Sequence, residues 1–405
     1  MNRNDFAALL TPTGQQLLNE LAQSDLSETA RLRTLTHLRR RTEPNLAAAA
    51  LETAILRRRA ERKFSRAADM YFTRDALEQA TAETVAVHRA RRFAGYDQIV
   101  DLGCGIGGDS VALSAVAPTV GVDRDRLRLL MARANARAYG HGHQFAAVQA
   151  DVAGGGPIIA EAAFVDPSRR TTAGRRVFDA HNYQPPLAEV LAWRSRFRLL
   201  AVKLAPGIRD TDLAGVEAEV EFVAEGNDLK EAVLWLGAGV SEGRTATILP
   251  DGVTLHSDGD EAPPVRPAGS VLYEPNSAVI RAHLLGTLAR RLDAWQFDRS
   301  IAYLSAGELR HDRFARAWSI ETVLPFSVDR VRRYLRSHEV GRVTVKKRGS
   351  PLEPEAFLRM LRLHGENERT VVLTRQLGRP VALICTEANA DKRGLPSSAS
   401  ACDER

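Results

Sequence analysis

The sequence predicts an α/β protein in which a mostly parallel sheet lies between an N-terminal helical domain and a small C-terminal α+β domain. Three observations support this architecture. Residues 1–95 are rich in strong helix formers and show no alternating strand pattern. Five short apolar runs then alternate with helical or polar stretches, as in a parallel sheet covered by helices on both faces. Beyond a stretch rich in Gly, Pro, Asp and Ser, helices and strands alternate again.

The composition is that of a globular protein with a sizeable core. The chain has 405 residues, of which 44% are hydrophobic and 26% charged, with a net charge of +6. We expect two or three domains, and no apolar run reaches the roughly 18 residues of a membrane helix. The N-terminus lacks the apolar stretch of a secretion signal. Cys104, Cys385 and Cys402 lack metal-ligand spacing, which predicts a reduced, cytoplasmic setting and no metal site.

The helical domain is expected over residues 1–95, with helices at 46–56 and 74–92. The central domain is expected over residues 96–245, and its apolar runs have the length of buried parallel strands. These runs are 98–100, 119–122, 145–148, 162–165 and 199–202, with closing strands at 219–223 and 231–236.

The remaining chain is expected to hold a linker with a mixed α/β extension over 246–322, a small α+β domain over 323–386 and a disordered tail over 387–405. The elements predicted in the α+β domain are a helix at 329–337, a basic strand at 341–348, a helix at 354–363 and a hairpin that turns at Gly378.

A glycine-rich loop follows the first apolar run. The segment Asp101-Leu-Gly103-Cys-Gly105-Ile-Gly107-Gly108 leads into a helix that begins near Ser110. Glycines let the backbone turn sharply and let a ligand lie against the main chain. The spacing also satisfies G-x-G-x-x-G, so a dinucleotide site is an alternative.

Acidic residues after three successive runs favour a methyl-donor nucleoside, S-adenosylmethionine (SAM). Asp101 can pair with the ammonium of the methionine part. Asp123 can accept both ribose hydroxyls, which also fits NAD, and Asp151 can receive the adenine amino group. No Tyr/Lys or His/Asp set for hydride transfer is evident, which disfavours an NAD-dependent oxidoreductase.

These segments, with 133–140, resemble class I SAM-dependent methyltransferases, most of all the trimethylguanosine-synthase type. The resemblance implies a Rossmann-like core with a mostly parallel seven-stranded sheet. It also implies SAM as the cofactor, held by the residues Asp101, Gly103, Gly105, Gly107, Asp123 and Asp151. Residues 70–78 lie where such enzymes carry a segment that closes over the donor, which implicates Phe72 and Thr73. The whole chain further resembles bacterial class I methyltransferases that end in a THUMP-like domain, a type associated with RNA.

Class I methyltransferases place the acceptor after the fourth strand, here Asp166-Pro167-Ser168-Arg169. This is similar to the Asp/Asn-Pro-Pro-Tyr motif of enzymes that methylate exocyclic base nitrogens. The similarity implies that Asp166 and a backbone carbonyl accept hydrogen bonds from the amine. Ser168 and Arg169 depart from the motif, so the acceptor atom stays open. A base can stack on Arg169 or on Tyr183, although Tyr183 can equally pack in the core.

Lys203 follows the fifth run beside the same cleft, where it can contact phosphate or form a structural pair. Two basic stretches flank the central domain and are expected to bind phosphates, with Lys63 and Arg348 among their members. Solvated helix faces are the alternative. The stretches comprise Arg57–Arg59, Arg62, Lys63, Arg66, Arg89, Arg91 and Arg92, and then Arg330, Arg332, Arg333, Arg336, Arg342 and Lys346–Arg348.

Together these features predict a SAM-dependent methyltransferase that acts on a base nitrogen of tRNA or rRNA, without a metal or a membrane. Pyrimidine C5 methylation commonly uses a cysteine beside the acceptor, and none is near Asp166 in sequence. A methyltransferase for a small molecule or a protein, with outer domains for packing or dimerisation, stays open. The acidic trio disfavours an RNA-binding protein with a relic donor site.

Overall fold

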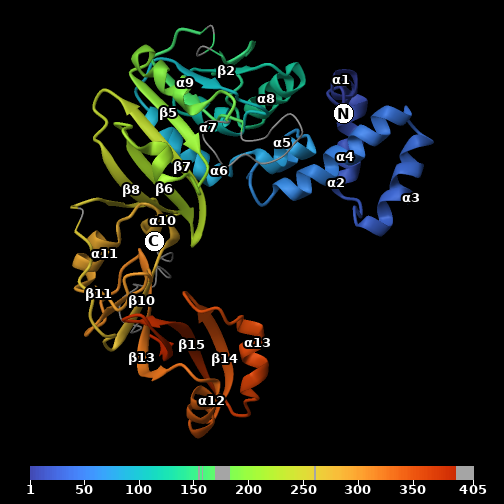
Figure 1. The fold of residues 1–405 in the computed structure, drawn as a ribbon. Helices are drawn as coiled ribbons and strands as arrows, with labels where there is room; N and C mark the ends of the chain where they lie inside the picture. Colours follow the sequence, from blue (N-terminus) through green and yellow to red (C-terminus); the bar gives the residue numbers. More distant parts are fainter. Residues whose placement is uncertain (154–155, 157, 169–182, 260, 389–405) are drawn as a thin grey trace, which may run out of the picture. The chain divides into compact units, whose positions relative to one another are not determined.

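The structure is a computed structural model that describes residues 1–153, 156, 158–168, 183–259 and 261–388 (Figure 1). The chain divides into two compact units, Met1–His256 and Ser257–Arg405. This division differs from the expected boundaries at 245 and 322, because a strand crosses each of them. β8 (Gly243–Leu249) extends the first sheet, and β13 (Ala315–Pro325) belongs to the second. Of the tail expected over 387–405, only residues 387 and 388 are described.

Helices form the N-terminal part of the first unit, as predicted. Their bounds are α1 Arg3–Leu9, α2 Pro12–Ala22, α3 Glu28–Arg39, α4 Pro44–Ala60, α5 Arg74–Gln79 and α6 Glu83–Ala90. Proline opens α2 and α4 at a position where its missing N–H costs no hydrogen bond. The single helix expected over 74–92 is two helices, since Ala80 and Ala82 adopt extended backbone angles on either side of Thr81.

The first sheet confirms the Rossmann-like prediction and extends it from seven to nine strands, in the order β3-β2-β1-β4-β5-β7-β6-β8-β9. β1 to β5 are parallel, whereas β7 is antiparallel to both of its neighbours. The strands are β1 Ile99–Leu102, β2 Thr119–Asp123, β3 Phe145–Gln149, β4 Ala162–Val165, β5 Leu199–Leu204, β6 Glu219–Glu225, β7 Asp228–Gly237, β8 and β9 Val253–His256.

Strand register places the carboxyl ends of the parallel strands at one edge of the sheet. Leu102, the last residue of β1, pairs with Val122 of β2 and with Val165 of β4. The residues that follow, including Gly103 and Asp166, therefore leave the sheet side by side. Ligands of open parallel sheets bind at this edge.

Helices α7 (Gly108–Ser114), α8 (Arg126–Ala138) and α9 (Leu187–Ala192) follow strands of this sheet (Figure 1). The buried side chain of Asn135 on α8 joins three segments. Its Oδ1 accepts a hydrogen bond from Tyr71 N at 2.8 Å, and its Nδ2 donates to Tyr71 O at 3.1 Å and to Ile106 O at 2.8 Å. Asn135 therefore fixes the segment before α5 against the glycine-rich loop, as an amide with both donors and its acceptor in use.

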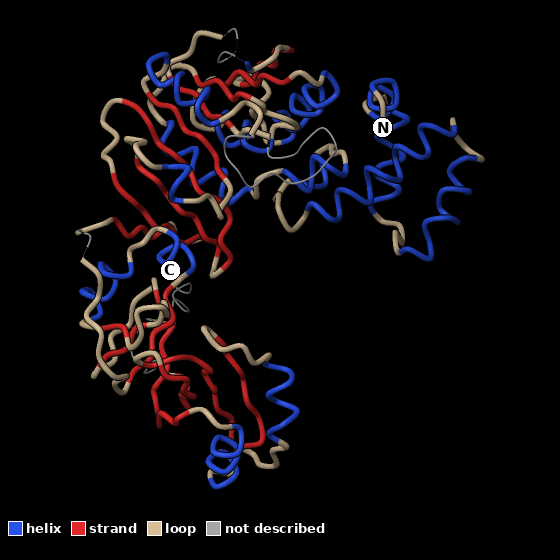
Figure 2. The backbone as a smooth tube through the Cα atoms, viewed as in Figure 1, coloured by secondary structure: helices blue, strands red, loops and turns tan. Residues whose placement is uncertain are grey.

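The second unit contains a seven-stranded sheet in the order β11-β12-β10-β13-β16-β15-β14 (Figure 2). Its elements are β10 Val271–Pro275, α10 Ser277–Arg281, α11 Leu285–Leu292, β11 Trp295–Gln296, β12 Leu304–Ala306, β13, α12 Val328–Ser337, β14 Val340–Lys347, α13 Pro354–Leu361, β15 Asn367–Gln376 and β16 Arg379–Glu387. The predicted hairpin is confirmed: Thr374 pairs with Val381, and Gly378 in the turn has a φ of 78°. Throughout the described residues, no helix combines the length and the apolar character needed to cross a bilayer.

A protonated carboxyl lies at the end of β1. Asp101 is 1% exposed, and its Oδ2 accepts a hydrogen bond from Ser110 Oγ at 2.5 Å. Burial, and after it the negative charge of Asp109, raises the pKa of Asp101 from 3.8 to about 8. The folded protein thus keeps a proton on Asp101 at neutral pH that the unfolded chain releases.

This proton makes stability depend on pH. The contribution of Asp101 is fully present below pH 3.8 and is lost as the pH rises through about 8. As the pH rises from 6 to 8, the unfolding free energy of the unsubstituted protein should fall by about 2 kcal/mol because of Asp101, given about 1.4 kcal/mol per pH unit. Asp101→Asn should lack this part of the decrease. Urea unfolding at both pH values measures this difference. Parallel pH profiles for the two proteins would show that Asp101 is ionised in the folded state.

Candidate active site

A cavity of about 480 Å³ opens at the carboxyl edge of the first sheet. Its walls come from α5, from the loops after β1 to β4 and from the start of α9. Among the residues expected at the site, its lining includes Gly103, Gly105, Asp123, Asp151, Asp166, Pro167 and Ser168. Residues that are more than 60 positions apart in the sequence therefore face one space. The cavity falls in the size range of sites for small molecules and cofactors.

The glycine-rich loop has the backbone that its sequence requires. Gly103, Gly105 and Gly107 have φ values of 87°, 55° and 81°, in the left-handed region that favours glycine. Gly103 and Gly105 line the cavity, whereas a Cβ at Gly107 would lie 3.0 Å from the Cβ of Ala132 on α8. Gly107 thus permits close packing of α8 on the loop and does not itself face the cavity.

Two carboxylates are held in place by main-chain hydrogen bonds. Asp123, at the end of β2, accepts from Gly105 N at 2.9 Å and from Asp125 N at 2.8 Å, and it is 8% exposed. Asp151, after β3, accepts from Ala153 N at 2.9 Å. Both carboxylates line the cavity with lone pairs to spare for hydroxyl or amine donors of a ligand.

Three residues expected to touch the cofactor lie behind the walls that the described residues form. Asp101 is bonded to Ser110 in the interior, Phe72 is fully buried against Phe64, and Thr73 caps α5 by accepting from Ala76 N at 3.3 Å. The expected closing segment nevertheless reaches the cavity one turn later, because Ala76, Glu78, Gln79 and Ala80 line it. Phe72 and Thr73 therefore anchor this wall.

The acceptor segment begins where β4 ends. Ser168 and Gln184 exchange backbone hydrogen bonds of 2.9 and 3.0 Å, so the two ends of this loop are tied together beside the cavity. Arg169 lies outside the described residues. Tyr183 is 1% exposed, so its ring packs in the core and is not available for base stacking. Gln184, Pro185 and Pro186 form the wall instead.

Lys203 forms a structural pair, which is one of the two alternatives that the sequence left open, and its ammonium is buried. Its Nζ donates to Asp166 Oδ2 at 2.7 Å and to Thr81 Oγ1 at 2.7 Å. Burial alone lowers the pKa of Lys203, but the carboxylates around it, Asp166 first, outweigh burial and raise the pKa. Lys203 is therefore a charged partner of the acceptor carboxylate.

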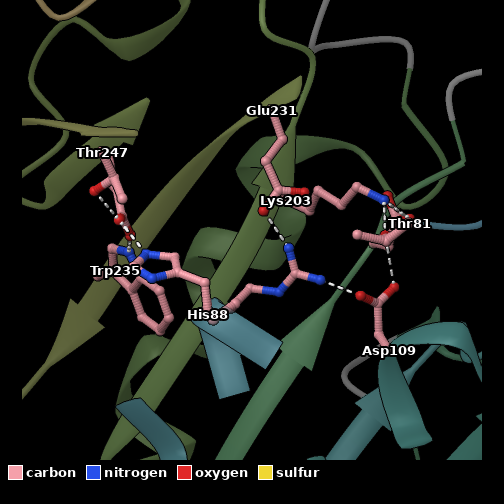
Figure 3. Close-up of polar contacts among 10 residues, drawn as sticks. Thr81, His88, Asp109, Lys203, Glu231, Trp235 and Thr247 are labelled. Carbon is pink, nitrogen blue, oxygen red and sulfur yellow. Dashed lines mark hydrogen bonds and ion pairs between the residues drawn. The ribbon is translucent and has the colours of Figure 1, made fainter. Parts of the chain in front are cut away.

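A second buried cation, Arg89, interacts electrostatically with Asp166 of this pair. Figure 3 shows its two acidic partners, Asp109 and Glu231. Arg89 was expected among phosphate-binding residues, yet it is 2% exposed and forms ion pairs with Glu231 and Asp109. Its guanidinium also stands 4.2 Å from the ring centroid of Phe164 on β4. Burial lowers the pKa of Arg89, and Glu231 and Asp109 more than compensate, so that it stays charged.

The polar partners of this network, Thr81, Asp109 and Glu231, were not identified as site residues from the sequence. Thr81 Oγ1 donates to Asp109 Oδ2 at 3.0 Å, which connects the Lys203 pair to the Arg89 pairs. Two signals were available, since Asp109 ends the glycine-rich motif and Glu231 is an acid inside a predicted strand. Charged residues in buried elements are seldom unpaired.

The side chains of the first basic stretch point in three different directions. Arg57 donates to Met70 O at 2.9 Å, and Lys63 donates to the carbonyls of Leu77 and Ala80, both at 2.9 Å. These contacts give both residues a structural role, and phosphate binding by either stays a prediction. Three members of the stretch line a recess of about 360 Å³ in the N-terminal helices, together with Arg31, Leu26 and Ile55. These members are Arg58, Arg59 and Arg62.

The second basic stretch is largely paired within its own unit. Arg348 donates to Ala302 O at 2.9 Å and stands 4.8 Å from the ring centroid of Tyr303. Lys346 Nζ bonds Glu274 Oε2 at 2.7 Å, and Lys347 bonds Glu353. Arg348 therefore has structural contacts in this unit, and its predicted role in binding phosphate stays a prediction.

Metal and thiol chemistry find no support in the part of the chain that the structure describes. It holds no group of three or more His, Cys, Asp or Glu side chains that could bind a metal ion. Cys104 and Cys385 are free and buried. Burial raises the pKa of both thiols, and the negative charges of Asp101 and Asp123 raise the pKa of Cys104 further. Neither thiol is therefore a ready nucleophile.

Three families match separate parts of the sequence. Residues 96–180 match the RNA cap guanine-N2 methyltransferase family, 315–387 match a THUMP domain-like family, and 2–60 match a domain of unknown function. A crystal structure of a candidate methyltransferase from Porphyromonas gingivalis W83 has the same fold, with a TM-score of 0.80 and 20% identity. It covers 96% of this chain, and all of that protein is matched.

Two curated relatives from Mycobacterium tuberculosis, strains CDC 1551 / Oshkosh and ATCC 25618 / H37Rv, are described as uncharacterized S-adenosylmethionine-dependent methyltransferases. Each is 38% identical over 351 residues, which cover 83% of this chain and 96% of the relative. Identity at this level over nearly the full length of both relatives confirms the predicted enzyme class and cofactor. The chain belongs to the S-adenosylmethionine-dependent methyltransferases.

Proposed function

We propose that this enzyme transfers a methyl group from SAM to a base nitrogen of RNA, with Asp166 as the residue that receives the acceptor amine. One observation carries the proposal. A Cβ built on Gly103 in the donor loop would lie 3.6 Å from the backbone oxygen of Asp166. The donor loop and the backbone carbonyl of Asp166 therefore lie within a few ångströms of each other in the cavity, as direct methyl transfer requires.

The cavity fits the donor chemically. Gly105 has nothing within 4 Å of its Cβ position, so a ligand can lie against the main chain there. Asp123 offers carboxylate lone pairs for ribose hydroxyls, and Asp151 offers them for the adenine amine. SAM supplies an electrophilic methyl group on a sulfonium. The described residues that line the cavity include six acidic residues and two arginines, and this excess of acids suits the positive charge of the sulfonium.

The acceptor side fits an exocyclic amine. The Asp166 side chain is 25% exposed and lines the cavity, and its backbone oxygen faces Gly103. Two oxygens of one residue can accept the two hydrogens of an amine, which leaves the nitrogen lone pair directed at the methyl group. Cys104 also lines the cavity, but its thiol is buried and its pKa is raised, which disfavours its use as a nucleophile for carbon methylation.

The recess lined by Arg31, Arg58, Arg59 and Arg62 supports a polyanionic acceptor. Arg31 donates to Leu26 O, and Arg58 donates to the carbonyls of Ala22 and Ser24. The four guanidinium groups around the recess form a positive surface that suits phosphates. The side chains of Arg58 and Arg59 are exposed on α4, in the same unit as the cavity.

Donor binding is tested with Asp123→Ala. The substitution removes the carboxylate expected to accept both ribose hydroxyls, so affinity for S-adenosylhomocysteine should fall about 100-fold, at about 1.5 kcal/mol per lost charged hydrogen bond. Isothermal titration calorimetry measures the change. Asp228→Ala removes a carboxylate whose side chain is 77% exposed and serves as the matched control. Affinity within twofold of the unsubstituted protein would place the ribose elsewhere.

The acceptor is tested with methyl-labelled SAM and separate pools of RNA, protein and metabolites from cells that lack this enzyme. We expect label in RNA. Asp166→Ala should lower transfer at least about 100-fold, since the amine loses its orienting oxygen, while S-adenosylhomocysteine affinity changes little. Label in protein or in metabolites alone would overturn the RNA assignment. Full activity of Asp166→Ala would overturn the acceptor assignment.

The arginine recess is tested with the double substitution Arg59→Glu/Arg62→Glu. We expect KM for the methylated RNA to rise at least about tenfold, and the slope of log KM against log salt concentration to fall by about 1.4, at about 0.7 per phosphate. Arg39→Glu/Arg40→Glu makes the same charge change at the end of α3, away from the recess, and should act weakly. Equal effects of the two double variants would show that the overall positive charge, and not the recess, binds the RNA.

A further inference from the structure

The acceptor carboxylate is held by a buried lysine, and this contact has a definite geometry. Lys203 is the fifth residue of β5, and its Nζ lies 2.7 Å from Asp166 Oδ2. The lysine side chain is 6% exposed and that of Asp166 is 25% exposed. The lysine thus approaches from the protein interior, and the aspartate lies between it and the cavity.

Lys203 is itself fixed by a second residue. Its Nζ donates to Thr81 Oγ1 at 2.7 Å, and the same hydroxyl donates to Asp109 Oδ2 at 3.0 Å. A threonine hydroxyl has one proton to donate and can accept at the same time, so both contacts are satisfied together. Thr81 connects α5 and α6, and Figure 3 shows it beside the end of the Lys203 side chain. The segment that walls the cavity therefore sets the position of the lysine.

The pair leaves one carboxylate oxygen for the substrate. Lys203 bonds Oδ2, and the contacts among described residues include no hydrogen bond to Oδ1. Because the side chain lines the cavity, Oδ1 can accept from a ligand while Oδ2 stays with the ammonium. A carboxylate without this partner could rotate about χ2, since that torsion has broad, roughly two-fold preferences.

We propose that Lys203 is a positioning residue, which holds the Asp166 carboxylate turned toward the acceptor amine through its contact with Oδ2. The proposal rests on the proposed function in taking Asp166 as the acceptor-binding residue. It assigns to Thr81 the task of fixing the lysine. Lys203 itself touches neither substrate, which separates its role from that of Asp166.

The chemistry explains why a cation is useful at this place. Transfer forms a bond from the acceptor nitrogen to the methyl carbon as the carbon–sulfur bond breaks, so the nitrogen becomes positively charged and must release a proton. The Asp166 carboxylate can accept a hydrogen bond from the amine beforehand and can receive that proton afterwards, on its way to solvent. Lys203 keeps one oxygen of this carboxylate directed at the amine by occupying the other.

The competing explanation is that Lys203 only neutralises buried carboxylates. Both explanations predict that Lys203→Met destabilises the protein, because it leaves buried acids uncompensated. Only a positioning role predicts a selective loss of kcat in folded material, with recovery when the positive charge is retained. Lys203→Arg retains the charge, and Thr81→Val removes the anchor while the Lys203–Asp166 pair remains.

The test measures kcat and KM of methyl transfer for full-length Lys203→Met, Lys203→Arg and Thr81→Val, with whichever pool the unsubstituted enzyme labels. We expect Lys203→Met to lower kcat about 100-fold, with a much smaller change in KM. Lys203→Arg should recover at least about tenfold of that loss, and Thr81→Val should lower kcat about threefold to tenfold. Calorimetric affinity for S-adenosylhomocysteine should stay within about threefold. Lys230→Met, at a half-exposed lysine near the β6–β7 turn, is the control.

An acceptor-independent measurement keeps the proposal separate from the RNA assignment. In urea unfolding, Lys203→Met and Asp166→Asn should be strongly non-additive, because each removes the other's partner. Label in protein or metabolites would overturn the RNA acceptor but leave the Lys203 comparison valid on that substrate. An unchanged kcat in Lys203→Met, equal activity of the Met and Arg variants, or additive unfolding energies would each overturn the proposal.

Discussion

The structure of the active site depends on two buried cations that hold carboxylates at the carboxyl edge of the first sheet. Lys203 pairs with Asp166, and Arg89 pairs with Asp109 and Glu231. Loss of one partner from such a buried set costs about 3–5 kcal/mol, since the remaining charge has no counter-ion. Three acids face two cations here, and this excess of negative charge borders a cavity suited to a cationic ligand.

The same network joins elements that are distant in sequence. Thr81 and Arg89 come from the helical segment before the sheet, Asp109 from the start of α7, and Glu231 from the antiparallel strand β7. Together with Asn135, which fixes Tyr71 against the glycine-rich loop, it makes the N-terminal helices part of the active site. The helical domain therefore shapes one wall of the cavity and also carries the arginine recess.

The sequence predicted those features that are local or periodic. Apolar runs located all seven core strands, and the acids that follow β2 and β3, Asp123 and Asp151, do line the cavity. Side-chain direction in charged segments could not be predicted, because one turn of helix decides whether an arginine meets solvent or a buried acid. Arg89 and Lys63 face inward and Arg59 does not, although all three belong to one basic stretch. Pairing across 122 and 37 residues, as Lys203 makes with Thr81 and Asp166, leaves no local pattern.

A crystal structure of the enzyme with S-adenosylhomocysteine would test the central claim, which is that one cavity brings a donor nucleoside to the Lys203–Asp166 pair. The account predicts the ribose hydroxyls within hydrogen-bond distance of Asp123, the adenine beside Asp151, and the sulfur facing Asp166 with its lysine contact intact. A nucleoside bound outside this cavity, or an Asp166 carboxylate turned away from it in the complex, would contradict the account.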